Sequence, residues 1–155
     1  MRAVVLPPFW SLVEAHGDEL LAHARRMTDD QSAEDVLQDA LLRALRAYPR
    51  LRHADHLRAW LYRVTTTTAL DLHRRRRREI PTDEPPVQAV EAEYDDGAFE
   101  SLIAPLAPTA RDALRLRFVE DLDYDRIALE LGTSPEAARQ RVSTAVRTLR
   151  ERVSA

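Results

Sequence analysis

Side chains able to bind a nucleic acid gather near the carboxyl end of this 155-residue chain. Arginine and glutamine can form paired hydrogen bonds with base edges, and serine and threonine hydroxyls can bond to phosphates. On a helix, these residues would lie opposite a stripe of apolar residues between Ala138 and Val153. The candidates for this DNA-facing side are Arg139, Gln140, Arg141, Ser143, Thr144 and Arg147.

The residues before this helix are typical of a helix-turn-helix. Ala128 is small enough to let two helices cross closely, and Gly132 can take the left-handed backbone that ends a helix. Ser134 can cap the next helix, and Pro135 suits its first position. An ordinary helical hairpin with a solvated outer face is the alternative. The spacing of these residues favours the DNA-binding motif.

A second basic feature is the run of five arginines from Arg74 to Arg78. One interpretation is a solvated helix end, because cations are favoured near a helix C-terminus. Five adjacent charges repel one another without an anionic partner, however. We therefore favour contact with DNA phosphates, which predicts strongly salt-dependent binding.

Other kinds of chemistry find no support in the sequence. There is no Ser/His/Asp set, glycine-rich phosphate loop or metal-ligand spacing, so we expect no enzymatic activity, cofactor, metal site or small-molecule substrate. His53 and His56 lack the further ligands that a metal needs. The absence of cysteine suits the reducing cytoplasm, and no apolar stretch is long enough for membrane insertion.

The apolar spacing predicts helices and no strands. A first helix should run over about 9–27, and a second should begin at Ser32, with Asp35 completing a capping box, and stop before Pro49. A third should run from near Asp55 to the arginine run, and packing must hold its four consecutive threonines helical. Its inward residues would be Leu57, Trp60, Leu61, Val64, Thr68 and Leu72.

The net charge of −3 conceals a segregation along the chain. Residues 79–100 hold eight acidic residues and no basic ones, and several prolines there block helix formation. Both flanking segments are net positive. We therefore predict an all-α fold with two small helical domains, at 1–78 and 99–155, joined by an acidic linker at 79–98. Two interpretations of this linker remain open. It is a disordered tether, or it is a segment that a partner orders.

Three motifs occur in a specific order. Ala-Glu-Asp-x-x-Gln-Asp lies at 33–39, Ala-Trp-Leu-x-Arg lies at 59–63, and the arginine run and terminal helix-turn-helix follow. Together they resemble the extracytoplasmic-function (group IV) class of bacterial RNA polymerase sigma factors. The resemblance implies sigma domain 2 at 1–78, sigma domain 4 at 99–155, and a promoter-directing initiation factor. Its implied partners are core RNA polymerase, promoter DNA and an anti-sigma protein.

The resemblance also implies roles for individual residues. The polymerase-binding residues would be Asp35, Gln38, Asp39, Leu41 and Leu42. The minus-ten DNA contacts would be His53, His56, Trp60, Arg63, Thr67 and Arg74, Arg75, Arg76, Arg77 and Arg78. The minus-35 element would be read by the six candidates near the carboxyl end. Capping of a helix is an equal alternative for Asp35, and a core position is the favoured interpretation of Trp60.

Two departures from the family pattern bear on recognition. Thr66 and Thr67 stand where relatives usually carry Arg-Asn, and threonine cannot form the paired base contact of asparagine. Ala137 lacks the hydroxyl that is common at its position. The departures at Thr66 and Thr67 keep one alternative open, a sigma-like decoy that binds an anti-sigma protein without recruiting polymerase. A stand-alone helix-turn-helix regulator is a separate alternative.

Overall fold

The computed structural model describes residues 5–52, 54–78 and 96–154, and within them all regular secondary structure is helical, as predicted. The predicted linker at 79–98 lies largely outside the described residues. The elements in chain order are α1 (Phe9–Met27), α2 (Asp30–Ala47), the 3₁₀ turn η1 (Tyr48–Arg50), α3 (Leu57–Arg78), α4 (Asp96–Ile103), α5 (Pro108–Phe118), α6 (Tyr124–Leu131) and α7 (Pro135–Ser154). None of the described helices is long and apolar enough to span a membrane.

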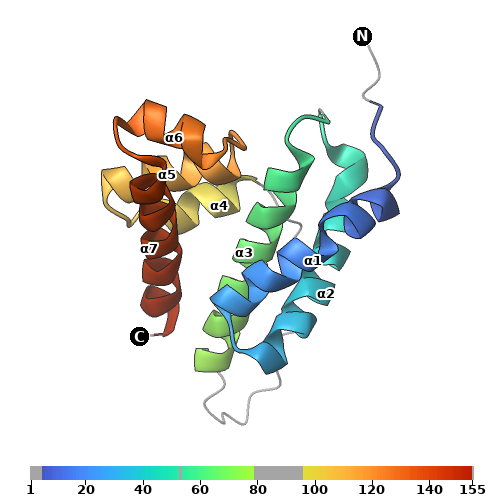
Figure 1. The fold of residues 1–155 in the computed structure, drawn as a ribbon. Coiled ribbons are helices and arrows are strands. Elements are labelled where there is room, and N and C mark those ends of the chain that lie inside the picture. Colours follow the sequence, from blue (N-terminus) through green and yellow to red (C-terminus); the bar gives the residue numbers. More distant parts are fainter. Residues whose placement is uncertain (1–4, 53, 79–95, 155) are drawn as a thin grey trace.

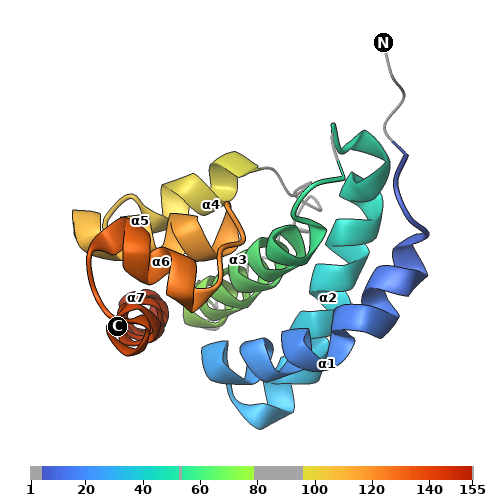
Figure 2. The same ribbon diagram turned by 45° about the horizontal axis from the view of Figure 1, so that its top comes forward.

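The helices form two groups that meet at α3. Helices α1, α2 and α3 pack together as a first helical unit, and α4 to α7 form a second helical unit (Figure 1). Turning the molecule shows α3 between α1 and α2 on one side and the second unit on the other (Figure 2). The buried residues of both units join in one core cluster, which includes Leu20 and Leu61 of the first unit and Phe118 of the second.

Helix α3 is buried on all its sides over residues 59–70. We expected α3 to bury a single stripe of residues, and this expectation is wrong. The helix is buried around its whole circumference because both units pack against it. Each hydroxyl of residues 65–68 donates a hydrogen bond to the carbonyl four residues earlier, at 2.7–2.9 Å. The four threonines are thus buried without an unsatisfied hydroxyl.

The start of α2 differs from the prediction. Its N-cap is Asp29, whose carboxylate accepts a hydrogen bond from the Ser32 amide at 2.8 Å, so Ser32 lies inside the helix. Asp35 is exposed one turn further on. The capping-box prediction for Ser32 and Asp35 is therefore wrong, because an aspartate three residues before Ser32 offers the same cap earlier.

The helix-turn-helix forms as predicted, from α6 and α7. Gly132 ends α6 in the left-handed conformation, with φ 65° and ψ 40°. The Ser134 hydroxyl accepts a hydrogen bond from the Ala137 amide at 3.1 Å, and α7 begins at Pro135. Ile127, Ala128 and Ala138 form a small second core where the two helices cross.

Candidate nucleic-acid interface

One face of α2 presents polar and apolar side chains to solvent together. Asp35, Gln38, Asp39 and Leu42 follow the spacing i, i+3, i+4 and i+7, which places them on a single face. Leu42 is 53% exposed, a large fraction for leucine on a packed helix. Leu41 instead packs against the core, so it contributes little to this outer face. We call Asp35, Gln38, Asp39 and Leu42 the α2 face.

The buried Arg43 contacts part of this face. Its guanidinium lies 2.8 Å from the Asp71 carboxylate of α3 and 3.5 Å from the Asp39 carboxylate. Arg43 is 8% exposed, but the Asp39 side chain is 47% exposed, so this ion pair restrains Asp39 only weakly. Arg43 is held more closely by Asp71 and links α2 to α3 beneath the α2 face.

The arginine run extends the end of α3 into solvent. Arg74, Arg75 and Arg76 are exposed, and the side chains of Arg77 and Arg78 lie outside the described residues. Arg76 lies 3.6 Å from Asp29, and Arg74 lies 3.9 Å from Asp71. Such half-exposed ion pairs contribute little to stability, so most of the charge stays available to an anionic partner.

The other minus-ten candidates lie in or beside the contact between the units. Trp60 is 4% exposed and packs against Tyr48, which confirms its core interpretation. Arg63 donates a hydrogen bond to the Phe118 carbonyl of α5, and Thr67 is buried. In this arrangement these three residues face the core or the second unit, so their contact with DNA stays a prediction that requires the units to separate. His53 lies outside the described residues.

The six candidates on α7 lie on more than one side of that helix. Arg139 and Gln140 are exposed, and the Arg139 guanidinium lies 4.8 Å from the Tyr124 ring centre. Gln140, Arg141 and Thr144 border a shallow hollow beside α5. Ser143 and Arg147 border a cleft toward the first unit. The predicted DNA-facing side is therefore partly turned toward α1 and α3.

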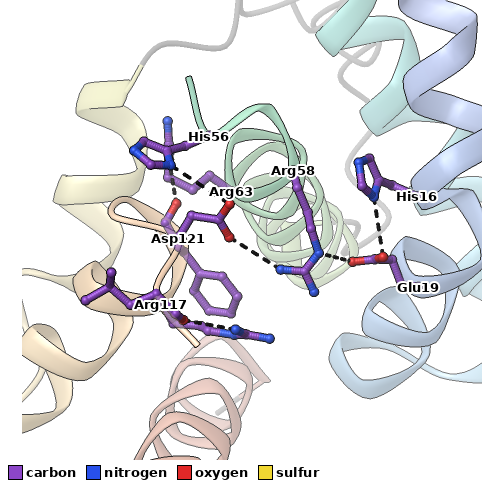
Figure 3. Close-up of polar contacts among 9 residues, drawn as sticks. His16, Glu19, His56, Arg58, Arg63, Arg117 and Asp121 are labelled. Atoms are coloured by element: carbon purple, nitrogen blue, oxygen red, sulfur yellow. Dashed lines mark hydrogen bonds and ion pairs between the residues drawn. The ribbon is translucent and has the colours of Figure 1, made fainter. Parts of the chain in front are cut away.

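A network of charges joins the units on one side of α3 (Figure 3). Arg58 lies between two carboxylates, 2.5 Å from Glu19 of α1 and 3.4 Å from Asp121 in the loop between α5 and α6. His56, which has a positive φ of 59°, lies 4.0 Å from Asp121. Burial tends to raise the pKa of Glu19, but hydrogen bonding from Tyr62 and the charge of Arg58 outweigh it and lower that pKa.

Aromatic packing joins the units beside this network. The rings of Tyr62 and Phe118 stack with their centres 5.8 Å apart, and His23 lies 5.6 Å from Phe118. His23 Nε2 is 2.8 Å from the Thr66 hydroxyl oxygen, and that hydroxyl donates to the Tyr62 carbonyl. Thr66 must therefore accept from His23, which fixes the proton of the neutral imidazole on Nε2. Burial, with the charge of Arg26, lowers the pKa of His23 to about 3.

Sequence reasoning did not find the contact residues Glu19, Arg58 and Asp121. Charged residues on helix surfaces and in loops are normally solvated, and partners 39 and 63 positions apart in sequence leave no local pattern. The sequence held one signal of the contact. Arg63 is the sole charged residue between Ala59 and Leu70. Such a stretch indicates a helix buried on all sides.

Comparison with known proteins matches two segments of the chain to two families. Residues 12–79 match the family Sigma-70 region 2, and residues 96–149 match Sigma-70, region 4. The ECF RNA polymerase sigma factor SigG of Mycobacterium tuberculosis is 46% identical over 76 residues, which are 48% of this chain and 20% of SigG. The ECF RNA polymerase sigma factor SigE of Mycolicibacterium smegmatis is 28% identical over 94% of this chain and 62% of its own length.

A further relative matches along nearly its whole length. The RNA polymerase sigma-E factor of Streptomyces coelicolor is 30% identical over 153 residues, covering 95% of this chain and 86% of that protein. The chain thus spans about a fifth of SigG and less than two thirds of SigE, but most of the Streptomyces protein. On these matches, the chain belongs to the extracytoplasmic-function class of RNA polymerase sigma factors.

Proposed function

We propose that this chain binds core RNA polymerase and directs it to promoters by recognising minus-ten and minus-35 elements. The observation that carries the proposal is the α2 face, where Leu42 is more than half exposed beside three polar side chains. Adjoining exposed apolar residues with a polar surround are typical of a protein-binding surface, and Leu45, 39% exposed, lies three residues after Leu42 on the same helix. A stand-alone helix-turn-helix regulator would have no use for this face.

Residues 1–78 act in this proposal as sigma domain 2 and residues 99–155 as sigma domain 4, with 79–98 as the linker. The exposed arginines at the end of α3 bind phosphates near the minus-ten element. Arg139 and Gln140, which are exposed at the start of α7, are the leading candidates for reading the minus-35 element.

Promoter binding in this proposal requires the two units to separate. Ser143 and Arg147 border the cleft toward the first unit, while Arg63 and Thr67 are buried beside the second. A DNA groove and the opposite unit cannot occupy the same side of α7 together. We therefore assign the described arrangement to the free protein, and polymerase binding drives the separation.

The remaining parts of the proposal follow from the family. The chain acts by binding alone, with catalysis left to the polymerase, and it works in the cytoplasm where the polymerase and promoters are. An anti-sigma protein is the expected regulator, because the surfaces that would bind polymerase and DNA lie on two separable units.

Reconstituted transcription tests this function. Purified chain and core polymerase should give run-off transcripts from a subset of genomic promoter fragments. The double variant Gln38→Arg/Asp39→Arg should lose association with core while keeping its helical circular dichroism, because inverting charge at an interface typically costs several kcal/mol. Asp18→Arg, which inverts an exposed charge on α1, is the matched control. Core binding without any promoter-specific transcript would instead identify a decoy.

A further inference from the structure

A cleft of about 260 Å³ lies between the two helical units, bordered by α1, α3, α5, α6 and α7. Its charged side chains are four arginines, Arg26 from the first unit and Arg117, Arg147 and Arg150 from the second. Among the described residues no carboxylate borders it. Acidic residues outnumber basic ones in the chain as a whole, 26 to 23, so this is a local concentration of positive charge.

Neutral groups hold two of these arginines in position. The Arg117 guanidinium donates to the Leu122 carbonyl at 3.0 Å and lies 4.5 Å from the Tyr124 ring centre. Arg150 donates to the main-chain carbonyl of Arg26 at 3.2 Å, across the contact between the units. Carbonyls and aromatic rings orient a guanidinium without neutralising it.

The acidic group beside the cleft is already engaged. Glu19 shares a hydrogen bond with Tyr62 at the cleft border, but its carboxylate is paired with Arg58 at 2.5 Å. Within the described residues, the side chains of Arg26 and Arg147 form no ion pair with any carboxylate. Packing the units together therefore gathers like charges from both, and a bound anion would offset their repulsion.

The chemistry of the cleft selects the kind of anion. Guanidinium groups bind phosphoryl oxygens through paired hydrogen bonds, and four of them exceed what a single small monoanion needs. The Ser143 hydroxyl adds a further polar group. The cavity is smaller than the 300–1,000 Å³ or so that is usual for drug-sized ligands, so a compact ligand fits best.

We propose that this cleft binds a small polyanion with two or more linked phosphoryl groups, bridging Arg26 of the first unit to Arg117, Arg147 and Arg150 of the second. This proposal rests on the proposed function in one respect: Ser143 and Arg147 are candidates for DNA contact. An anion held there stabilises the packed arrangement of the units and competes with promoter DNA for α7. The ligand thereby favours the inactive free protein.

Isothermal titration of the full chain with inorganic tripolyphosphate, at constant ionic strength, tests the proposal. We expect saturable one-to-one binding, which Arg26→Gln and Arg147→Gln each weaken about tenfold or more, because each removes one charged hydrogen-bonding partner. Arg25→Gln is the matched control. Arg25 neighbours Arg26, is exposed, lies 3.9 Å from Asp30 and is not part of the cleft lining, so its loss should change affinity less than about twofold.

Further ligands identify the source of the phosphoryl groups. A nucleoside triphosphate that binds more tightly than tripolyphosphate indicates a nucleotide, whereas equal affinity indicates the polyphosphate chain itself. No saturable binding at millimolar concentration overturns the proposal, and so does an equal loss in Arg25→Gln. Tighter binding of a single-stranded oligonucleotide with the same dependence on Arg26 and Arg147 would assign the cleft to nucleic acid instead.

Failure of this proposal and failure of the proposed function can be told apart. Arg26 is outside the surfaces assigned to polymerase and DNA, so Arg26→Gln should keep run-off transcription in the absence of polyphosphate. In wild type, added tripolyphosphate should reduce transcription more than in Arg26→Gln. A chain that binds tripolyphosphate but directs no transcription would retain the site and lose the function.

Discussion

The buried His23 makes the stability of this protein depend on pH in a way that can be calculated. Its imidazole is 3% exposed and lies between Tyr62 and Phe118, with Nε2 bonded to the Thr66 hydroxyl. Burial and the nearby Arg26 charge hold its pKa at about 3 in the folded chain, against 6.5 for an unperturbed histidine. The folded state therefore keeps this group neutral under conditions where the unfolded chain protonates it.

The direction in which stability changes with pH follows from the number of protons that His23 binds in the folded and the unfolded state. Well above pH 6.5 both states are neutral at His23, and the group adds no pH dependence. Between pH 6.5 and about 3 the unfolded state binds one more proton, so the free energy of unfolding falls by up to about 1.4 kcal/mol per pH unit. Integrated from pH 7 to pH 5, the loss is about 2 kcal/mol, a large part of the stability of a small domain.

The variant His23→Gln isolates this effect. Glutamine does not titrate, and its amide can still donate a hydrogen bond to Thr66. Urea denaturation followed by circular dichroism at pH 7 and pH 5 should show wild type losing about 2 kcal/mol more than the variant. The comparison cancels the carboxylates that both proteins share. Equal losses in the two proteins would show that His23 is protonated in the folded state, which would refute its assigned environment.

Three further predictions concern the nucleic-acid surfaces and the helix-turn-helix. Replacing Arg75 and Arg76 with Gln should flatten the log–log salt dependence of holoenzyme–promoter binding by roughly one to two units, measured by filter binding, and should leave core association unchanged. An unaltered slope with a shifted melting temperature would leave the run as a structural helix end. Arg139→Ala or Gln140→Ala should relax preference at one position of the minus-35 element, at about 1–3 kcal/mol, in binding to a panel of mutated promoters. Uniform weakening across the panel would instead indicate phosphate contacts. Asp123→Ala should lower the free energy of unfolding by about 1 kcal/mol, because its carboxylate accepts from the Arg126 amide at 2.8 Å, and urea denaturation at neutral pH measures this.

Local signals in the sequence were enough to predict most of the helices. The first helix runs over 9–27 as expected, and Gly132, Ser134 and Pro135 take the roles predicted for them. These features depend on residues within one turn of each other, so the sequence displays them directly. The error at α2 shows the limit, because Asp29 and Ser32 are both good caps and their order alone does not decide between them.

The contact between the units could not be predicted in the same way. Arg58 would be read as a solvated charge from its neighbours, and its partners Glu19 and Asp121 come from α1 and from the loop after α5. The candidate DNA contacts were chosen by motif position, which carries no information about whether a second unit covers them. Arg63 and Thr67 were therefore expected at a DNA surface and are buried beside α5 and α7 instead.

The free energy of the contact between the two units determines whether the free protein can be mostly packed and still separate reversibly. Phe118 packs against Tyr62 across this contact, and of the two Arg58 ion pairs only the one with Asp121 crosses between the units, adding at most about 1 kcal/mol. Repulsion among the cleft arginines acts in the opposite direction. For a net preference of about 2 kcal/mol, roughly 3% of the free protein would have its units apart. A partner that binds only the separated units would then bind about thirtyfold more weakly than to a fully separated chain, a loss that an interface of ordinary size easily offsets. The α2 face is exposed in the packed arrangement, so binding there alone does not separate the units; in the proposed function the separation requires polymerase or promoter DNA to contact surfaces that the packed units cover.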